Sequence, residues 1–212
     1  MTHRPRSTHP YAHAARLPEG DGSVLLDDVL PGTGPFEIEI GPGRGGFMFE
    51  RAAAAPEARI LGFEIRRKWA HIVDERLKKA GLGARARVLA EDAGVALGRL
   101  GPDASVRTFF LHFPDPWWKK RHEKRLVMRD TLLDAIVRLL VPGGALYVQT
   151  DVEERAVRYA EQIAGHGGFV PAGDVAGDPH MAENPYDARS PREHRAIADG
   201  LPVHRLRYQK PA

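Results

Sequence analysis

Hydrophobic and polar residues follow two different periods along this chain, and these periods predict its strands and helices. Residues 36–40 alternate apolar and charged side chains, which predicts a strand, and a short helix is expected over residues 47–55. Residues 59–64 form a second predicted strand. A helix that ends near Gly81 is expected after it. Its apolar face is predicted to carry Trp69, Ile72, Val73, Leu77 and Ala80.

The second half of the chain continues this alternation of strands and helices. Residues 106–113 are almost continuously apolar, which is typical of a strand that is buried on both faces. Residues 114–125 have no periodicity, and residues 165–191 are predicted to be irregular. The other expected elements are strands at 87–90, 145–150 and 203–208, the last at an edge, and helices at 132–140 and 153–164.

Strands and helices that alternate at these lengths predict the α/β class, with a mostly parallel sheet and helices on both faces. We interpret residues 21–212 as one domain. Residues 1–20 are rich in Pro, His and Arg without periodicity, so we interpret them as a mobile basic arm. Ligands of such sheets bind beyond the carboxyl ends of the strands. The residues that follow each strand are therefore the candidates for function.

A glycine-rich loop follows the first long strand, with Gly41, Gly43 and Gly46 in its turn. Glycines let a backbone approach a ligand closely, and the helix that follows points its N-terminus at that ligand. The same spacing fits a dinucleotide, so the loop alone does not choose the cofactor. Glu39 lies beside the loop and would repel a pyrophosphate. It suits S-adenosylmethionine, which carries a sulfonium and an ammonium group and no phosphate.

Three further acids follow successive strands. Glu64 ends the second strand and is expected to accept both ribose hydroxyls of a nucleoside cofactor, and Asp92 follows the third strand near the expected adenine position. Asp115 follows the fourth strand between Pro114 and Pro116, which fix its backbone. We therefore expect Asp115 at the mouth of the cofactor site. Three acids and a glycine loop in register indicate a site rather than solvated loops.

The segment after Asp115 combines aromatic and basic residues. Trp117 and Trp118 offer flat faces on which a nucleic-acid base can stack. The formal net charge of +3 is too small to indicate a nucleic-acid partner by itself. Its distribution is more informative, because local basic runs bind phosphates. The predicted phosphate-binding run consists of Lys119, Lys120, Arg121, Lys124 and Arg125, and a solvated charged face is its alternative interpretation.

Composition excludes several other classes of protein. A chain of 212 residues suits a single domain with a sizeable core, and the absence of cysteine excludes disulfides and thiolate chemistry. The ten histidines are scattered, and none pairs with an acid at metal-ligand spacing, so we expect no metal site. No apolar stretch approaches the ~18 residues of a membrane span, and no secretory signal is visible. These features favour a cytoplasmic protein, either a monomer or a homodimer.

The run PDPWWKKRHEKR over residues 114–125 resembles that of the bacterial TrmB-type tRNA (guanine-N7-)-methyltransferases. The resemblance covers residues 35–155 well and the remainder loosely. It implies a single-domain Rossmann-like class I methyltransferase fold with seven strands. It also implies methylation of N7 of a guanine in tRNA, at position 46 in the variable loop. The cofactor contacts that it implies are Glu39, Glu64, Asp92 and Asp115.

The resemblance also implies contacts with tRNA or guanine at Lys119 and Asp151, and in a C-terminal motif. The family motif reads roughly Thr-Lys-Phe-Glu-x-Arg, and the nearest match here is Ser-Pro-Arg-Glu-His-Arg over residues 190–195. It keeps Ser190, Glu193 and Arg195 but replaces the Lys-Phe pair. Leu126 also stands where the family usually has a second arginine. These departures concern the docking of the substrate more than the chemistry.

Guanine N7 has a free lone pair, so methyl transfer needs no base to remove a proton. The enzyme has to align N7 with the methyl and sulfur atoms, and a carboxylate at Asp115 would stabilise the purine as positive charge develops on it. Asp151 or Glu193 could accept hydrogen bonds from guanine N1–H and N2–H. Adenine does not offer that pattern of donors, so selection of guanine would follow.

Three other interpretations are compatible with parts of this pattern. A nicotinamide-dependent dehydrogenase would explain the glycine loop, but not Glu39 or the proline and tryptophan run. A non-catalytic RNA-binding module with the same fold is disfavoured because the acids and the loop are all present. A methyltransferase acting on another RNA is permitted by the altered C-terminal motif.

Overall fold

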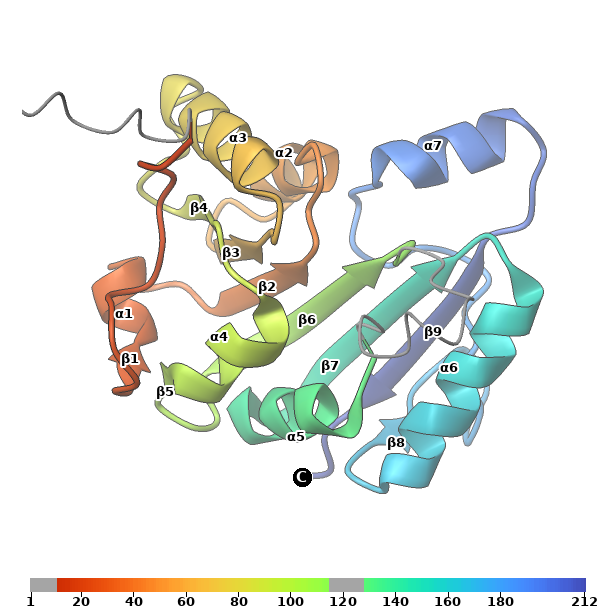
Figure 1. The fold of residues 1–212 in the computed structure, drawn as a ribbon. Coiled ribbons are helices and arrows are strands. Elements are labelled where there is room, and N and C mark those ends of the chain that lie inside the picture. The colour runs from red at the N-terminus through yellow and green to blue at the C-terminus, as the bar shows by residue number, and fades with distance from the viewer. Residues whose placement is uncertain (1–10, 115–127) are drawn as a thin grey trace, which may run out of the picture.

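The computed structural model describes residues 11–114 and 128–212, and a seven-stranded mixed sheet forms their centre (Figure 1). The strand order is β4-β3-β2-β6-β7-β9-β8, and only the pairings of β9 are antiparallel. The mostly parallel α/β sheet is therefore confirmed. The strands are β2 (Phe36–Ile40), β3 (Arg59–Phe63), β4 (Ala86–Leu89), β6 (Val106–His112), β7 (Leu140–Thr150), β8 (Val170–Pro171) and β9 (His204–Gln209).

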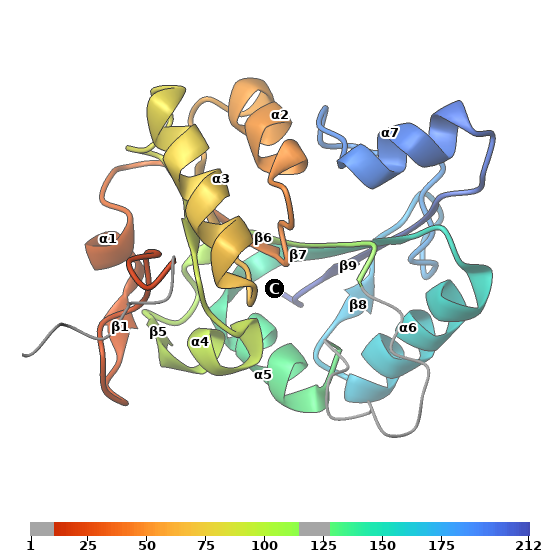
Figure 2. The same ribbon diagram turned by 45° about the horizontal axis from the view of Figure 1, so that its top comes forward.

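Helices cover both faces of this sheet, as the sequence predicts (Figure 2). One face carries α2 (Gly46–Ala54), α3 (Arg67–Lys79) and α7 (Pro191–Ala198). The other carries α4 (Ala93–Arg99), α5 (Asp130–Leu139) and α6 (Glu153–His166). A small parallel sheet of β1 (Val24–Leu25) and β5 (Leu100–Gly101) lies beside α1 (Leu26–Val29). No helix in the described part of the chain is both long enough and apolar enough to cross a membrane.

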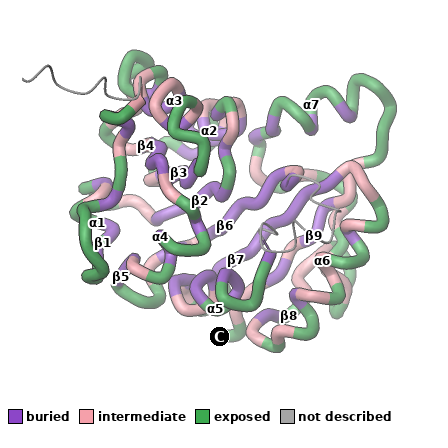
Figure 3. The backbone as a smooth tube through the Cα atoms, in the orientation of Figure 1, coloured by how far each residue is buried: buried purple, intermediate pink, exposed green. Residues whose placement is uncertain are grey.

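The central strands are buried on both faces (Figure 3). In β2 this includes the charged residues, because Glu37 is fully buried and Glu39 is only 2% exposed. The alternation in this strand therefore does not separate a core face from a solvent face. It separates an apolar face, which packs into the main core, from an acidic face covered by α2 and by the segment that precedes α7.

Three local features differ from the sequence prediction. Strand β9 is not an edge strand, because the two-residue strand β8 pairs with its outer side. Helix α5 ends at Leu139, and β7 begins at residue 140 rather than at the predicted residue 145. Helix α7 was not predicted, although it has sequence signals for its start: Ser190 caps it and Pro191 occupies its first turn.

The N-terminal segment from residue 11 packs on the domain in the described part. Ala14 and Leu17 are buried, and the backbone N–H of Ala90 donates to the carbonyl of Ala15 at 2.7 Å. Arg16 also forms a two-pronged ion pair with Glu91, with both distances 3.1 Å. The composition of residues 1–20 does not reveal these contacts, because they join positions more than seventy residues apart.

Candidate active site

A cavity of about 930 Å³ lies where the parallel strands end. It is lined by the residues that directly follow β2, β3, β6 and β7, and by the start of α7. This is the place at which open α/β sheets bind ligands. The structure thus brings together side chains from the glycine loop, from three strand ends and from the C-terminal region.

The glycine loop forms the wall of the cavity after β2. Gly41 and Gly43 have φ angles of +72° and +55°, a region that side chains with a Cβ rarely adopt. The loop then enters α2 at Gly46. A Cβ atom added to Gly46 would lie 2.3 Å from Cγ of Pro191. A side chain at residue 46 would therefore displace α7 from α2. The positive φ angles of Gly41 and Gly43 and the close approach of Gly46 to Pro191 both fix the shape of the cavity.

Glu64 connects the end of β3 to this loop. Its Oε2 accepts a hydrogen bond from the backbone N–H of Gly43 at 3.0 Å, and its Oε1 accepts from the backbone N–H of Arg66 at 2.9 Å. The Arg66 side chain also pairs with Oε1 at 3.2 Å. Glu64 lines the cavity although only 3% of its side chain is exposed. Its carboxylate is therefore held rigidly where a ligand hydroxyl can donate to a remaining lone pair.

Glu39 forms a buried pair with His112, which the sequence analysis did not identify. Nδ1 of His112 lies 3.0 Å from Oε1 of Glu39, and the imidazole ring packs on Phe47 with centroids 4.2 Å apart. Oε2 of Glu39 is buried and has no hydrogen-bond partner within the described chain. Burial of an unpaired carboxylate oxygen costs free energy, so a ligand that supplies a hydrogen-bond donor or a cation would stabilise this atom. A ligand that carries an ammonium or sulfonium group fits that requirement.

The acids after β4 also lie at the cavity. Asp92 caps α4 by accepting from the backbone N–H of Gly94 at 2.8 Å, and it remains exposed. Its neighbour Glu91 lines the cavity too, but its carboxylate is engaged by Arg16 and by the backbone N–H of Leu17. Asp92 is therefore the freer of the two acids for a ligand.

At the opposite wall, Asp151 and Arg192 form an ion pair. Nε and Nη2 of Arg192 both bind Oδ2 of Asp151, at 2.9 and 2.5 Å, and both residues line the cavity. Ser190 also lines it, and its hydroxyl accepts from the backbone N–H of Glu193 at 3.1 Å as the cap of α7. Arg192 is the third residue of the predicted C-terminal motif, where the family motif has Phe. Its pairing with Asp151 could not be read from the sequence, because 41 residues separate them.

Two members of the predicted C-terminal motif do not line this cavity. Glu193 is fully buried, and its oxygens are bound by Arg205 at 3.0 Å and by the side-chain amide of Asn184 at 2.9 Å. Both of its oxygens have partners and it does not line the cavity, so its contacts anchor α7. Arg195 is exposed in the last turn of α7.

The remaining predicted site residues lie outside the described part of the chain. They are Asp115, Trp117, Lys119, Lys120, Arg121, Lys124 and Arg125. Pro114 is the last described residue before them, and it lines the cavity. Phe113, just before it, has a φ angle of +45°, which is uncommon for a bulky residue and turns the chain away from the direction of β6.

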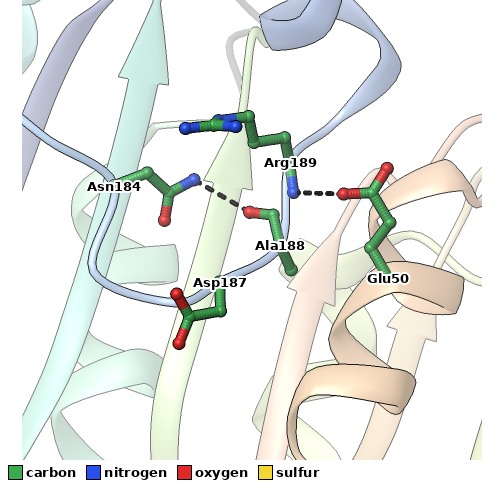
Figure 4. Close-up of a pocket in the computed structure, with 5 residues that line it drawn as sticks. All are labelled: Glu50, Asn184, Asp187, Ala188 and Arg189. Carbon is green, nitrogen blue, oxygen red and sulfur yellow. Dashed lines mark hydrogen bonds between the residues drawn. The ribbon is translucent and has the colours of Figure 1, made fainter.

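A second, smaller pocket of about 210 Å³ lies between α2 and the segment that precedes α7 (Figure 4). Glu50 on α2 accepts from the backbone N–H of Arg189 at 2.8 Å, and the side-chain amide of Asn184 donates to the carbonyl of Ala188 at 2.9 Å. Within this segment, burial raises the pKa of the Tyr186 hydroxyl, so that it stays neutral. The Glu50 contact holds the segment before α7 against α2, and the Asn184 contact fixes its turn.

Comparison with known sequences connects this cavity to a methyltransferase family. A family model described as "Putative methyltransferase" matches residues 33–206. A curated tRNA (guanine-N(7)-)-methyltransferase of Myxococcus xanthus (strain DK1622) is 38% identical over 180 residues, which cover 85% of each chain. A protein of the same name from Anaeromyxobacter dehalogenans (strain 2CP-C) is 38% identical over 199 residues, 90% of this chain and 96% of the relative.

Solved structures of methyltransferases share the fold at low sequence identity. The 16S rRNA methyltransferase KamB superposes with a TM-score of 0.61 at 15% identity, and the match covers 88% of this chain and 93% of KamB. TrmN from Thermus thermophilus gives a TM-score of 0.57 at 18% identity, over 84% of this chain and 44% of that chain. At these identities the likeness concerns the fold alone. It confirms the expected Rossmann-like methyltransferase fold.

Proposed function

We propose that this chain, which belongs to the tRNA (guanine-N7-)-methyltransferase family, transfers a methyl group from S-adenosylmethionine to N7 of a guanine in tRNA. The observation that carries the proposal is the cavity at the strand ends, where Glu39, Glu64 and Asp92 meet the glycine loop. These groups suit a nucleoside that carries positive charge and no phosphate. Because tRNA would be its substrate, we expect the protein in the cytoplasm.

The cofactor side of the cavity offers a partner for each part of S-adenosylmethionine. Glu64, fixed by Gly43 and Arg66, would accept the ribose hydroxyls, and Asp92 would accept from the adenine edge. The unpaired Oε2 of Glu39 would receive a donor from the cationic methionine portion. When bound, the cofactor supplies an electrophilic methyl group. The acids hold its two ends so that the methyl group can face the rest of the cavity.

The substrate side is formed by Asp151, Ser190 and Arg192. Arg192 binds only Oδ2 of Asp151, and no other described residue is hydrogen-bonded to Oδ1, so Oδ1 would accept from guanine N1–H and N2–H. We propose Asp115 as the carboxylate that stabilises the positive charge that develops on the purine. Guanine N7 needs no general base, so these residues act through alignment and electrostatics. In this arrangement Glu193 acts through its buried contacts with Arg205 and Asn184, not on the base.

Glu64→Ala is expected to weaken binding of S-adenosylmethionine by ~1–3 kcal/mol, because hydrogen bonds between the carboxylate and the ribose are lost. Isothermal titration calorimetry measures this effect. Glu75→Ala is the control, since Glu75 pairs with Lys78 on α3 and does not line the cavity. Unchanged affinity in Glu64→Ala, or tighter binding of NAD than of S-adenosylmethionine by the wild-type protein, would remove this cofactor assignment.

Asp151→Asn is expected to lower kcat/KM for tRNA by about 10- to 100-fold, the effect of ~1–3 kcal/mol of hydrogen bonding to a charged acceptor. Steady-state methylation with saturating cofactor measures it. Arg192→Gln is the matched control, because it removes the partner of Asp151 while it leaves the carboxylate in place. A smaller loss is expected there. Equal losses in both variants would mean that the ion pair matters only for structure.

The family and the altered C-terminal motif leave another RNA as the alternative substrate. Labelled S-adenosylmethionine is offered to the purified protein together with either unmodified tRNA or ribosomal RNA from the same cells. We expect label in tRNA. Label in ribosomal RNA alone would establish the alternative, and cofactor binding without transfer to either RNA would favour a binding module.

A further inference from the structure

Three exposed cations gather where α3 begins, beside the cavity. Arg44 belongs to the glycine loop and lines the cavity, and Arg67 and Lys68 form the first residues of α3. Trp69 joins them, because the guanidinium carbon of Arg44 lies 4.9 Å from the centroid of the indole and Nζ of Lys68 lies 5.7 Å from it. The backbone of Arg44 is held as well, by a hydrogen bond from Arg76 to its carbonyl at 3.2 Å.

Within residues 11–114 and 128–212, these charges are not neutralised by acids. Among the described residues, no acid forms an ion pair with Arg44, Arg67 or Lys68. The neighbouring cations differ, since Arg66 pairs with Glu64 and Lys78 pairs with acids on its own helix. Uncompensated cations on one surface create a positive potential that attracts polyanions. A phosphate backbone is the ligand that matches such a surface.

The patch also has an apolar component at the cavity. Ile65 is 68% exposed and lines the cavity directly before these basic residues. Surfaces that track single nucleic-acid strands combine cations for the phosphates with flat or apolar groups for bases and sugars. A base that enters the cavity carries its flanking phosphates to the rim. Arg44, at that rim, is placed to meet one of them.

We propose that Arg44, Arg67 and Lys68, together with Ile65, form a docking face that binds the tRNA backbone on the glycine-loop side of the cavity. This proposal rests on the proposed function and adds a second contact region to the basic run at residues 119–125. The two regions follow different strands, since Ile65, Arg67 and Lys68 come after β3 and the basic run comes after β6. The docking face therefore consists of residues that the basic run does not contain. Its ligand is RNA phosphate and not the cofactor.

Lys68→Gln tests the proposal against Lys79→Gln. Both lysines are exposed on α3, but they are eleven residues apart, roughly 16 Å along the helix. Binding of unmodified tRNA is measured by fluorescence anisotropy over a series of salt concentrations. We expect Lys68→Gln to flatten the slope of log K against log salt by ~0.7–0.9, the value for one lost phosphate contact, and Lys79→Gln to keep the wild-type slope.

The double variant Arg67→Gln/Lys68→Gln extends this measurement. We expect a further flattening of the salt slope and a higher KM for tRNA, while calorimetry gives the wild-type affinity for S-adenosylmethionine, because neither residue lines the cavity. Wild-type salt slopes in both Lys68→Gln and the double variant, in a protein that methylates tRNA, would overturn the docking face and leave the proposed function intact. A wild-type protein that neither binds nor methylates tRNA would overturn both.

Discussion

Asp115→Asn is expected to lower the rate constant for methyl transfer by ~10²–10³, the usual effect of removing one preorganised electrostatic group. Asparagine keeps the shape of the side chain but removes the negative charge that offsets the forming purine cation. The interaction strengthens in the transition state, so the loss should appear mainly in the rate constant and less in binding. Single-turnover methylation of tRNA at saturating S-adenosylmethionine measures it directly.

Asp92→Asn is the control for this prediction. Asparagine still caps α4, so the helix should be preserved, and the lost charge lies at the cofactor end of the cavity. We expect weaker binding of S-adenosylmethionine with a smaller change in the rate constant. A rate near that of the wild-type protein for Asp115→Asn would remove Asp115 from the mechanism and leave Asp151, which lines the cavity, as the candidate acid.

Glu37→Ala is expected to reduce the free energy of unfolding by ~3–5 kcal/mol, the scale of a buried ion pair that loses one partner. The carboxylate of Glu37 is fully buried and binds Arg51 through two hydrogen bonds, at 2.7 and 2.8 Å, and Arg107 at 2.6 Å. Hydrogen bonds with Glu37 raise the pKa of the Arg51 guanidinium in the wild-type protein. Arg51 stays charged after the substitution as well, because arginine is not deprotonated at neutral pH in proteins. A buried cation without its acidic partner would remain.

Chemical denaturation monitored by circular dichroism measures the loss. Glu57→Ala is the matched control, because Glu57 is exposed and lies 3.6 Å from the same Arg107. The denaturation midpoint should stay nearly unchanged in this control. Equal midpoints for Glu37→Ala and the wild-type protein would show that Arg51 finds another partner, for example the carbonyl of Tyr186 that it already contacts at 2.8 Å.

The sequence sufficed to bring together the residues of the proposed cofactor side because they depend on local order. Glu64 ends the second predicted strand and Asp92 follows the third, and parallel strands end at the same edge of the sheet. The glycine loop is visible for the same reason, since its turn requires positive φ angles at Gly41 and Gly43. The structure places all of these residues on one cavity.

The parts that sequence did not predict depend on contacts between distant segments. Alternation in β2 predicted the strand but not the burial of its acids, since Glu37 is neutralised by arginines 14 and 70 residues away. The pairing of His112 with Glu39 joins the ends of β6 and β2. The pairing of Arg192 with Asp151 joins α7 to the end of β7. Glu193 belongs to the predicted substrate motif, and its buried contacts with Arg205 and Asn184 were not visible in the sequence.

The central claim is methyl transfer to N7 of guanine in tRNA, and the identity of the methylated nucleoside tests it most directly. Unmodified tRNA is incubated with the protein and S-adenosylmethionine, digested to nucleosides and analysed by mass spectrometry against standards. The proposed function predicts 7-methylguanosine as the new nucleoside, at one position of the tRNA. Methylation at another atom of guanine, methylation of another base, or no methylated nucleoside in tRNA would contradict it.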